Sequence, residues 1–122
     1  MTKEKIPSEH WEQVQFVSKF RKKYRPVKVF AIPNGGKRDK ITAQKLKAEG
    51  VLSGVPDLFI PEWRTWVEMK KVKDSYLSEE QKYMRDYLED ECGDDYIVGY
   101  GWEDAMEKIS FLENERNFTG LQ

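Results

Sequence analysis

Cysteine and histidine are almost missing from this chain. Its 122 residues include one cysteine, Cys92, and one histidine, His10. A single cysteine excludes a disulfide framework and a cysteine-based zinc site, and it favours a reducing, intracellular setting. A single histidine excludes a cluster of histidine ligands, so any bound metal is expected to have oxygen ligands.

Long apolar runs are missing as well. No stretch approaches the length that spans a membrane, and no apolar segment follows the charged N-terminus. We therefore expect no membrane partner and a cytoplasmic location. The length predicts a single domain over residues 1–122, with a core at about residues 8–115.

A strongly basic net charge, typical of many nucleic-acid-binding proteins, is also absent. The formal net charge is −1, but the charges are segregated along the chain. From Lys19 to Lys47 there are eleven lysines and arginines and one acid, Asp39. From Glu79 to Glu115 there are thirteen acids and three bases. We interpret the first region as a candidate for binding a polyanion and the second as a source of solubility.

The spacing of apolar residues predicts helices that alternate with short strands. The expected helices lie between Ser8 and Pro26, between Asp39 and Gly50, between Ser78 and Gly93, and from Trp102 to about Glu115. The expected strands cover residues 27–32, 58–60, 65–70 and 96–100, and residues 117–122 are expected to form a loose tail. Ser8, Asp39 and Ser78 are the expected N-caps. The residues expected to face the core are Trp11, Val14, Val17, Phe20 and Tyr24 in the first helix, Tyr83, Met84, Tyr87 and Leu88 in the third, and Ala105, Met106, Ile109 and Leu112 in the last.

Two acids and a lysine stand out in the middle of the chain. Asp57 follows Pro56 and opens the apolar run 58–60, while Glu68 and Lys70 lie in the run 65–70. With residues 61–64 as a turn, this pattern predicts a β-hairpin. Because strand side chains alternate between faces, Glu68 and Lys70 share one face, and Asp57 on the partner strand can reach the same place.

These three residues can hold a divalent metal against a phosphodiester. Asp57 and Glu68 would supply carboxylate oxygens to Mg²⁺ or Mn²⁺, and the backbone carbonyl of Met69 a neutral oxygen. Lys70 would orient the attacking water and offset developing charge. Taken alone, the same residues also fit a capped turn and a solvated surface pair. Their apolar neighbours favour the metal site, because charges on core strands are costly without a metal or a partner.

Several blocks of sequence, in the same order, resemble the VRR-NUC family, which are nucleases of the PD-(D/E)XK superfamily. The blocks are residues 31–38, 46–51, 54–58, 67–70, 77–81 and 101–102, within a resemblance that covers roughly residues 9–112. The family implies an α/β, restriction-endonuclease-like fold with a central mixed four-stranded sheet flanked by helices. It also implies a metal-dependent DNA endonuclease. For a standalone member of the virus and phage type, it implies a homodimer that prefers branched DNA such as Holliday junctions.

The resemblance also suggests supporting residues. Glu12 in the first helix is the candidate for a further metal or water contact, with Glu9 as its rival. Gln81 matches the glutamine that supports the family's site, although locally it fits a capping box with Ser78. The candidate DNA-binding residues are Asn34, Gly35, Gly36, Lys37, Arg38, Lys40, Lys71 and Lys73. The loop 73–76 departs from the family, which often has a glycine-rich basic stretch there.

Two other classes of protein remain open. One is a DNA-binding module that keeps the nuclease fold but does not cleave. The other is an interaction protein whose acidic C-terminal half docks a basic partner. Metal-dependent cleavage of DNA distinguishes the nuclease from the first alternative, and retention on DNA resin at moderate salt distinguishes it from the second.

Overall fold

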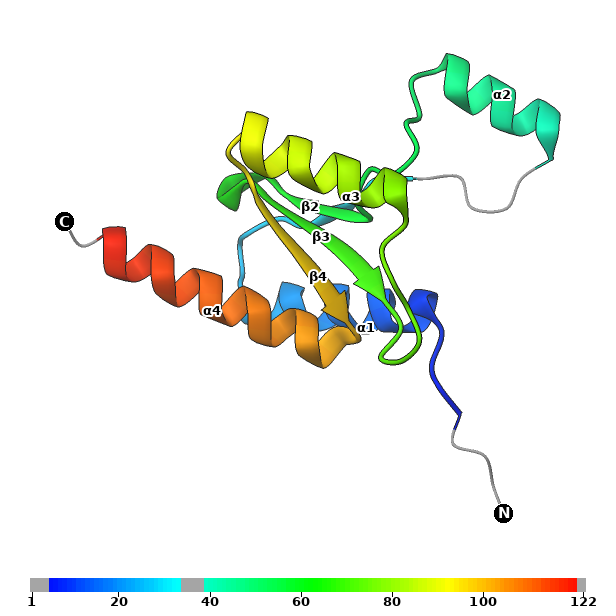
Figure 1. Cartoon of the computed structure of the whole chain (residues 1–122). Coiled ribbons are helices and arrows are strands. Elements are labelled where there is room, and N and C mark those ends of the chain that lie inside the picture. The colour runs from blue at the N-terminus through cyan, green and yellow to red at the C-terminus, as the bar shows by residue number, and fades with distance from the viewer. Residues whose placement is uncertain (1–4, 34–38, 121–122) are drawn as a thin grey trace.

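The computed structural model describes residues 5–33 and 39–120. It contains a sheet of four strands (Figure 1). The strands lie in chain order: β1 (Phe30–Ala31), β2 (Leu58–Ile60), β3 (Thr65–Lys70) and β4 (Asp95–Tyr100). β1 and β3 are each antiparallel to β2, and β4 is parallel to β3. The predicted central mixed four-stranded sheet is therefore confirmed.

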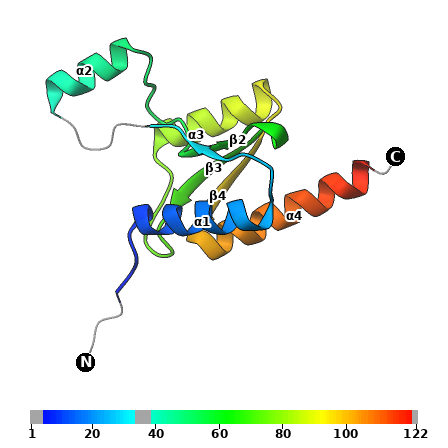
Figure 2. The same ribbon diagram turned by 180° about the vertical axis from the view of Figure 1, so that it is seen from behind.

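Helices cover both faces of this sheet (Figures 1 and 2). α1 (Glu9–Lys23) and α4 (Trp102–Gly120) lie on one face, over a core that includes Phe16, Phe20 and Ile109. α3 (Glu79–Asp86) and the π-helical turn that follows it (Tyr87–Glu91) cover the other face. α2 (Lys40–Ala48) stands away from the body and has no buried residue. Within the described residues, no helix is long and apolar enough to cross a membrane.

α1 begins where the sequence predicts, and Phe20, Val17 and Tyr24 pack in the core as expected, but the rest of the predicted face does not. Ser8 accepts a hydrogen bond from the Trp11 amide and is the N-cap. The buried row is Glu12, Phe16 and Phe20, whereas Trp11 and Val14 are 45% and 48% exposed. Two overlapping apolar rows compete on this helix. The row with two phenylalanines faces the sheet because it buries more apolar area.

α3 shows the same kind of correction. The predicted capping box between Ser78 and Gln81 is confirmed. Met84 and Leu88 are buried as expected, but Tyr83 and Tyr87 are exposed. Met84 and Leu88 are four residues apart and form one narrow row, which is all that a short helix can bury against the sheet.

Two predicted ends are wrong. The first strand is shorter than residues 27–32, because β2 offers only three residues to pair with and the register covers Phe30 and Ala31 alone. α4 continues to Gly120, so residues 117–120 are not a loose tail. Arg116 holds this part of the helix to the sheet: its Nη2 donates to the Trp63 carbonyl, to Thr65 Oγ1 and to the Asp95 carboxylate.

Candidate active site

The hairpin that carries the acidic residues forms as predicted. Leu58 pairs with Val67 and Ile60 with Thr65, and a short 3₁₀ turn (Pro61–Trp63) connects the strands. Asp57 is the residue immediately before β2, and Glu68 and Lys70 lie in the last three residues of β3. The hairpin therefore brings the two acids and the lysine to the same end of the sheet.

Pro56 and Asp57 together replace one pair of the ladder. Continuing the register by one hydrogen-bonded pair places Pro56 opposite Met69. The Met69 amide instead donates to Asp57 Oδ2 at 2.7 Å. Pro56 has no N–H to offer the Met69 carbonyl, and that carbonyl points to the same side of the strand as its own N–H. Asp57 and the Met69 carbonyl thus lie on the same side of β3, where β2 begins.

Glu68 is a carboxylate in an unfavourable position. Its side chain is 2% exposed, and Oε2 accepts a hydrogen bond from Gln81 Nε2 at 3.1 Å. With both acids ionised, Glu68 Oε1 is buried and has no hydrogen-bond partner among the described residues. Burial raises the pKa of Glu68 to about 9, helped by the Asp57 charge and by the hydrogen bond that the two carboxyl groups can share when one is protonated. The Lys70 charge lowers this pKa only in part.

Gln81 serves both of the roles that its position allows. Its Oε1 accepts from the Ser78 amide at 2.8 Å, which closes the capping box at the start of α3. Because the oxygen is used in this way, the amide NH₂ is directed at Glu68. The helix cap thereby holds the Gln81 NH₂ group in place as a hydrogen-bond donor to Glu68.

The two acids of α1 have different surroundings. Glu12 is 2% exposed and its Oε1 accepts from the Trp102 amide at 2.9 Å, at the positive end of α4. Glu9 is exposed, and its charge is among those that raise the pKa of Glu68, after burial and Asp57. The charge of Glu9 therefore acts on Glu68, while Glu12 Oε1 is bonded to α4.

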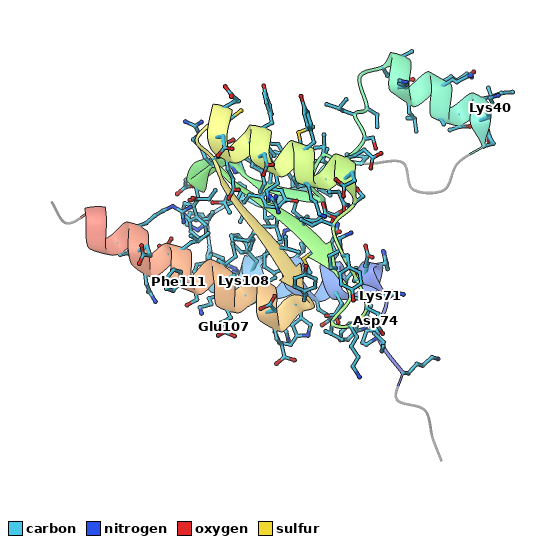
Figure 3. All side chains as sticks on the ribbon, in the orientation of Figure 1. Lys40, Lys71, Asp74, Glu107, Lys108 and Phe111 are labelled. Atoms are coloured by element: carbon cyan, nitrogen blue, oxygen red, sulfur yellow. The ribbon has the colours of Figure 1, made fainter. Side chains whose placement is uncertain are left out.

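The remaining predicted residues lie on several elements. Lys70 is 8% exposed, and its carbonyl accepts from the Gly101 amide where β3 ends. Lys40 begins α2, and Lys71 follows the end of β3 (Figure 3). Lys73 is exposed in the loop that follows. Asn34, Gly35, Gly36, Lys37 and Arg38 lie outside the described residues.

A hard divalent cation fits the donors at this site. In the described part of the chain, no group of three or more acids, histidines or cysteines is arranged to hold a metal. Asp57, Glu68 and the Met69 carbonyl are a smaller set, and all of their donors are oxygens, as Mg²⁺ and Mn²⁺ prefer. The unpaired Glu68 Oε1 and the raised pKa of this residue are what a site for positive charge requires.

Tyr96 is a neighbour of the site that the sequence pattern does not indicate. Within the described residues its buried hydroxyl has no hydrogen-bond partner, and burial followed by the Glu68 charge raises its pKa. In β4, Tyr96 pairs with Trp66 and Val98 pairs with Glu68. The parallel pairing therefore puts Tyr96 on the face that carries Glu68, and this pairing has no local signal in the sequence.

The mixed sheet, with helices on both faces, gives an α/β protein with a restriction-endonuclease-like fold. The chain is similar to a solved structure described as a VRR_NUC domain protein, with a TM-score of 0.73 and 26% sequence identity over 88% of each chain. This likeness confirms the predicted resemblance to the VRR-NUC family and supports a nuclease-type domain. No family sequence model and no curated protein matches the chain.

Proposed function

We propose that this protein is a metal-dependent DNA endonuclease that hydrolyses phosphodiester bonds. The observation that carries the proposal is the convergence of two carboxylates and a lysine, with one buried oxygen of Glu68 unpaired among the described residues. A purely structural role gives no reason to keep such a charge, because a buried carboxylate without enough partners costs folding free energy. Such positions are typical of functional sites.

Each side chain has a defined part in this proposal. Asp57, Glu68 and the Met69 carbonyl would hold Mg²⁺ or Mn²⁺, which when bound activates water and offsets charge on the phosphate. The Met69 amide orients Asp57, and Gln81 holds one oxygen of Glu68. Lys70 is nearly buried, so its ammonium is strongly attracted to the developing negative charge and can donate a hydrogen bond to the attacking water.

We assign the supporting acid of α1 to Glu9 rather than to Glu12. Glu9 is accessible to solvent and contributes to the field at Glu68. One oxygen of Glu12 is already bonded to the Trp102 amide, at the start of α4. Glu12 therefore stabilises the fold in this proposal, and Glu9 provides the further metal or water contact.

The preferred substrate is branched DNA such as a Holliday junction, and the working unit is a homodimer. Resolving a four-way junction needs two cuts on symmetry-related strands, and each chain carries a single Asp57, Glu68 and Lys70 set. A two-fold dimer supplies two sites in matching orientation. Lys40, Lys71, Lys73 and the predicted basic turn at 34–38 would contact phosphates.

A cleavage assay on labelled linear, flapped and four-way DNA tests the proposal. We expect cutting with Mg²⁺ or Mn²⁺, none in EDTA, and a faster reaction on the four-way substrate. Asp57→Ala and Glu68→Ala should each abolish cutting while the circular dichroism spectrum stays folded. Glu107→Ala, at an exposed acid of α4 (Figure 3), is the matched control and should cut normally.

The outcome also separates the alternatives. Near wild-type cutting by either active-site variant would show that the assigned site is wrong. DNA binding without metal-dependent cleavage would support a non-cleaving module with the nuclease fold. A strict monomer by light scattering, at micromolar concentration and with junction DNA present, would contradict the dimer but not the nuclease.

A further inference from the structure

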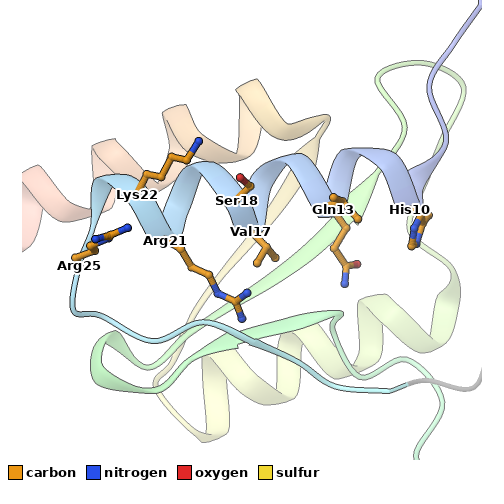
Figure 4. A pocket seen from close by; sticks show the side chains of 8 residues that line it. His10, Gln13, Val17, Ser18, Arg21, Lys22 and Arg25 are labelled. Atoms are coloured by element: carbon orange, nitrogen blue, oxygen red, sulfur yellow. The ribbon is translucent and has the colours of Figure 1, made fainter.

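A groove with basic walls runs along α1 on the side that faces the chain leading into β1. It encloses about 600 Å³, and its lining includes Gln13, Val17, Arg21 and Arg25. Figure 4 shows Gln13, Val17 and Arg21 extending from α1 toward that segment. A second hollow of about 450 Å³ shares Arg21 and Arg25 and continues along residues 26–29. The two hollows therefore form one continuous surface.

The charges on this surface are all of one sign. Arg21, Lys22, Arg25 and Lys28 contribute to the lining, and no aspartate or glutamate within residues 5–33 and 39–120 lines either hollow. Bases in the last turn of a helix usually stabilise the helix dipole, and this explains part of the cluster. It does not explain Arg25 and Lys28, which follow the end of α1 at Lys23.

Arg21 adds a second observation against a purely helical role. Its Nη2 donates to the carbonyl of Val29 at 3.4 Å, so the guanidinium crosses from α1 to the segment before β1. The side chain is thus held over the groove. An arginine positioned in this way can bind a phosphate oxygen with its remaining N–H groups.

The groove begins near the candidate active site and leads away from it. Its lining starts at His10 in the first turn of α1, where Glu12 accepts from the Trp102 amide and the neighbouring Gly101 amide donates to the Lys70 carbonyl. The distance from His10 to Arg25 along a helix is about 22 Å, at about 1.5 Å per residue. Because B-DNA rises about 3.4 Å per base pair, this length corresponds to about six or seven base pairs.

We propose that this groove binds the sugar-phosphate backbone of the duplex arm that leaves the active site, about six base pairs from the scissile phosphate. The inference rests on the proposed nuclease function. It names the part of the substrate that the bases between Arg21 and Lys28 contact. Arg21 and Arg25 each bind a phosphate of the arm, and Lys22 and Lys28 add to the local positive potential.

Arm length and charge can be varied together to test this. We would measure the affinity of the protein for two four-way DNAs, in Ca²⁺ or in EDTA. The long-armed DNA has arms of about 12 base pairs, and the short-armed DNA has arms of about four base pairs. Arg21→Gln/Arg25→Gln should weaken binding to the long-armed DNA by roughly 50-fold at about 0.1 M salt and reduce the salt slope by about 1.8, for two phosphate contacts. On the short-armed DNA the variant should bind like the wild type.

Two controls keep the result specific. Lys82→Gln/Arg85→Gln removes two charges from α3, on the opposite face of the sheet, and should leave binding to both substrates unchanged. Arg21→Lys/Arg25→Lys keeps the charges and should recover most of the lost affinity. Thermal unfolding confirms that each variant is folded.

Three outcomes would overturn the inference: no effect of the glutamine pair on long-armed DNA, an equal loss on both substrates, or a changed dimer mass with unchanged DNA affinity. These differ from a failure of the proposed function. A wild-type protein that never cleaves DNA would refute the nuclease, whereas the arm-length dependence of binding would still report on the groove.

Discussion

Glu68→Gln is expected to make the metal-free protein more stable at neutral and alkaline pH. The pKa of Glu68 rises from 4.5 to about 9 in the folded protein, because of burial first and then the Asp57 charge. The folded state therefore holds a proton that the unfolded state releases, and stability falls as pH rises from about 4.5 to 9. Glutamine cannot ionise, so the variant lacks this loss.

The expected magnitude follows from the pKa difference. Each unit of pKa corresponds to about 1.36 kcal/mol, so the range from about pH 4.5 to pH 7 costs the wild type about 3 kcal/mol. The glutamine introduced by the substitution keeps the shape of the protonated acid and should avoid this cost. At about pH 5 the two proteins should differ by less than about 1 kcal/mol, because both side chains are then almost neutral.

Urea unfolding in EDTA at about pH 5, 7 and 9 measures the effect. Glu107→Gln, which removes an exposed carboxylate from α4, is the control and should change stability by less than about 0.5 kcal/mol at every pH. If the Glu68 variant and the wild type have equal stability at neutral and alkaline pH, or if the wild type becomes more stable as pH rises, the electrostatic reasoning is refuted.

Adding metal should reverse the order of stability. A ligand that binds only the folded state stabilises it by about 4.1 kcal/mol at about 1,000 times its Kd, which exceeds the cost of about 3 kcal/mol at about pH 7. Saturating Mn²⁺ should therefore stabilise the wild type much more than Glu68→Gln, which has lost one anionic ligand. Equal stabilisation of both proteins would show that Glu68 does not hold the metal, and this readout does not depend on cleavage.

Three further predictions concern single side chains around the site. Lys70→Met should keep Mn²⁺ binding by calorimetry but slow cleavage by on the order of 100-fold, and loss of binding would count against its role. Glu12→Gln should lower the free energy of unfolding by about 1–2 kcal/mol, because it weakens the hydrogen bond to the Trp102 amide. Glu9→Gln should leave the free energy of unfolding unchanged and weaken metal binding. The reverse pattern would restore Glu12 as the active-site acid. Tyr96→Phe should preserve the free energy of unfolding or raise it by up to about 1 kcal/mol, because the Tyr96 hydroxyl is buried and has no hydrogen-bond partner among the described residues. A loss above about 1 kcal/mol would show that a water is bound to this hydroxyl.

Features that depend on near neighbours in the chain were predictable. Ser8 and Ser78 cap their helices through bonds that span three residues. The hairpin with Asp57 and Glu68 needs only a short turn and the alternation of strand side chains between two faces. Such short-range geometry is determined by residue type, so the order of elements could be predicted without knowledge of the tertiary structure.

Features that depend on distant contacts were not. The choice of Glu12 for the buried row of α1 depends on the Trp102 amide, 90 residues away along the chain. The extension of α4 depends on Arg116, whose partners lie on the hairpin and β4. The position of Tyr96 depends on the parallel pairing of β3 and β4. Periodicity can show that a helix is amphipathic, but it cannot choose between two rows that are both apolar.

The proline and the acid at 56 and 57 have linked physical roles, and this explains why the pair marks the site better than either residue alone. Pro56 is fully buried, and without an N–H it cannot continue the ladder with Met69. Asp57 Oδ2 accepts the Met69 N–H, which in a continued ladder would bond to the Pro56 carbonyl. The result is a strand that begins after a carboxylate bonded to the Met69 N–H, with Glu68 one residue before Met69 on β3. A substitution at either position would disturb both the end of the sheet and the set of oxygens, so the geometry of the site and the geometry of the fold are determined by the same two residues.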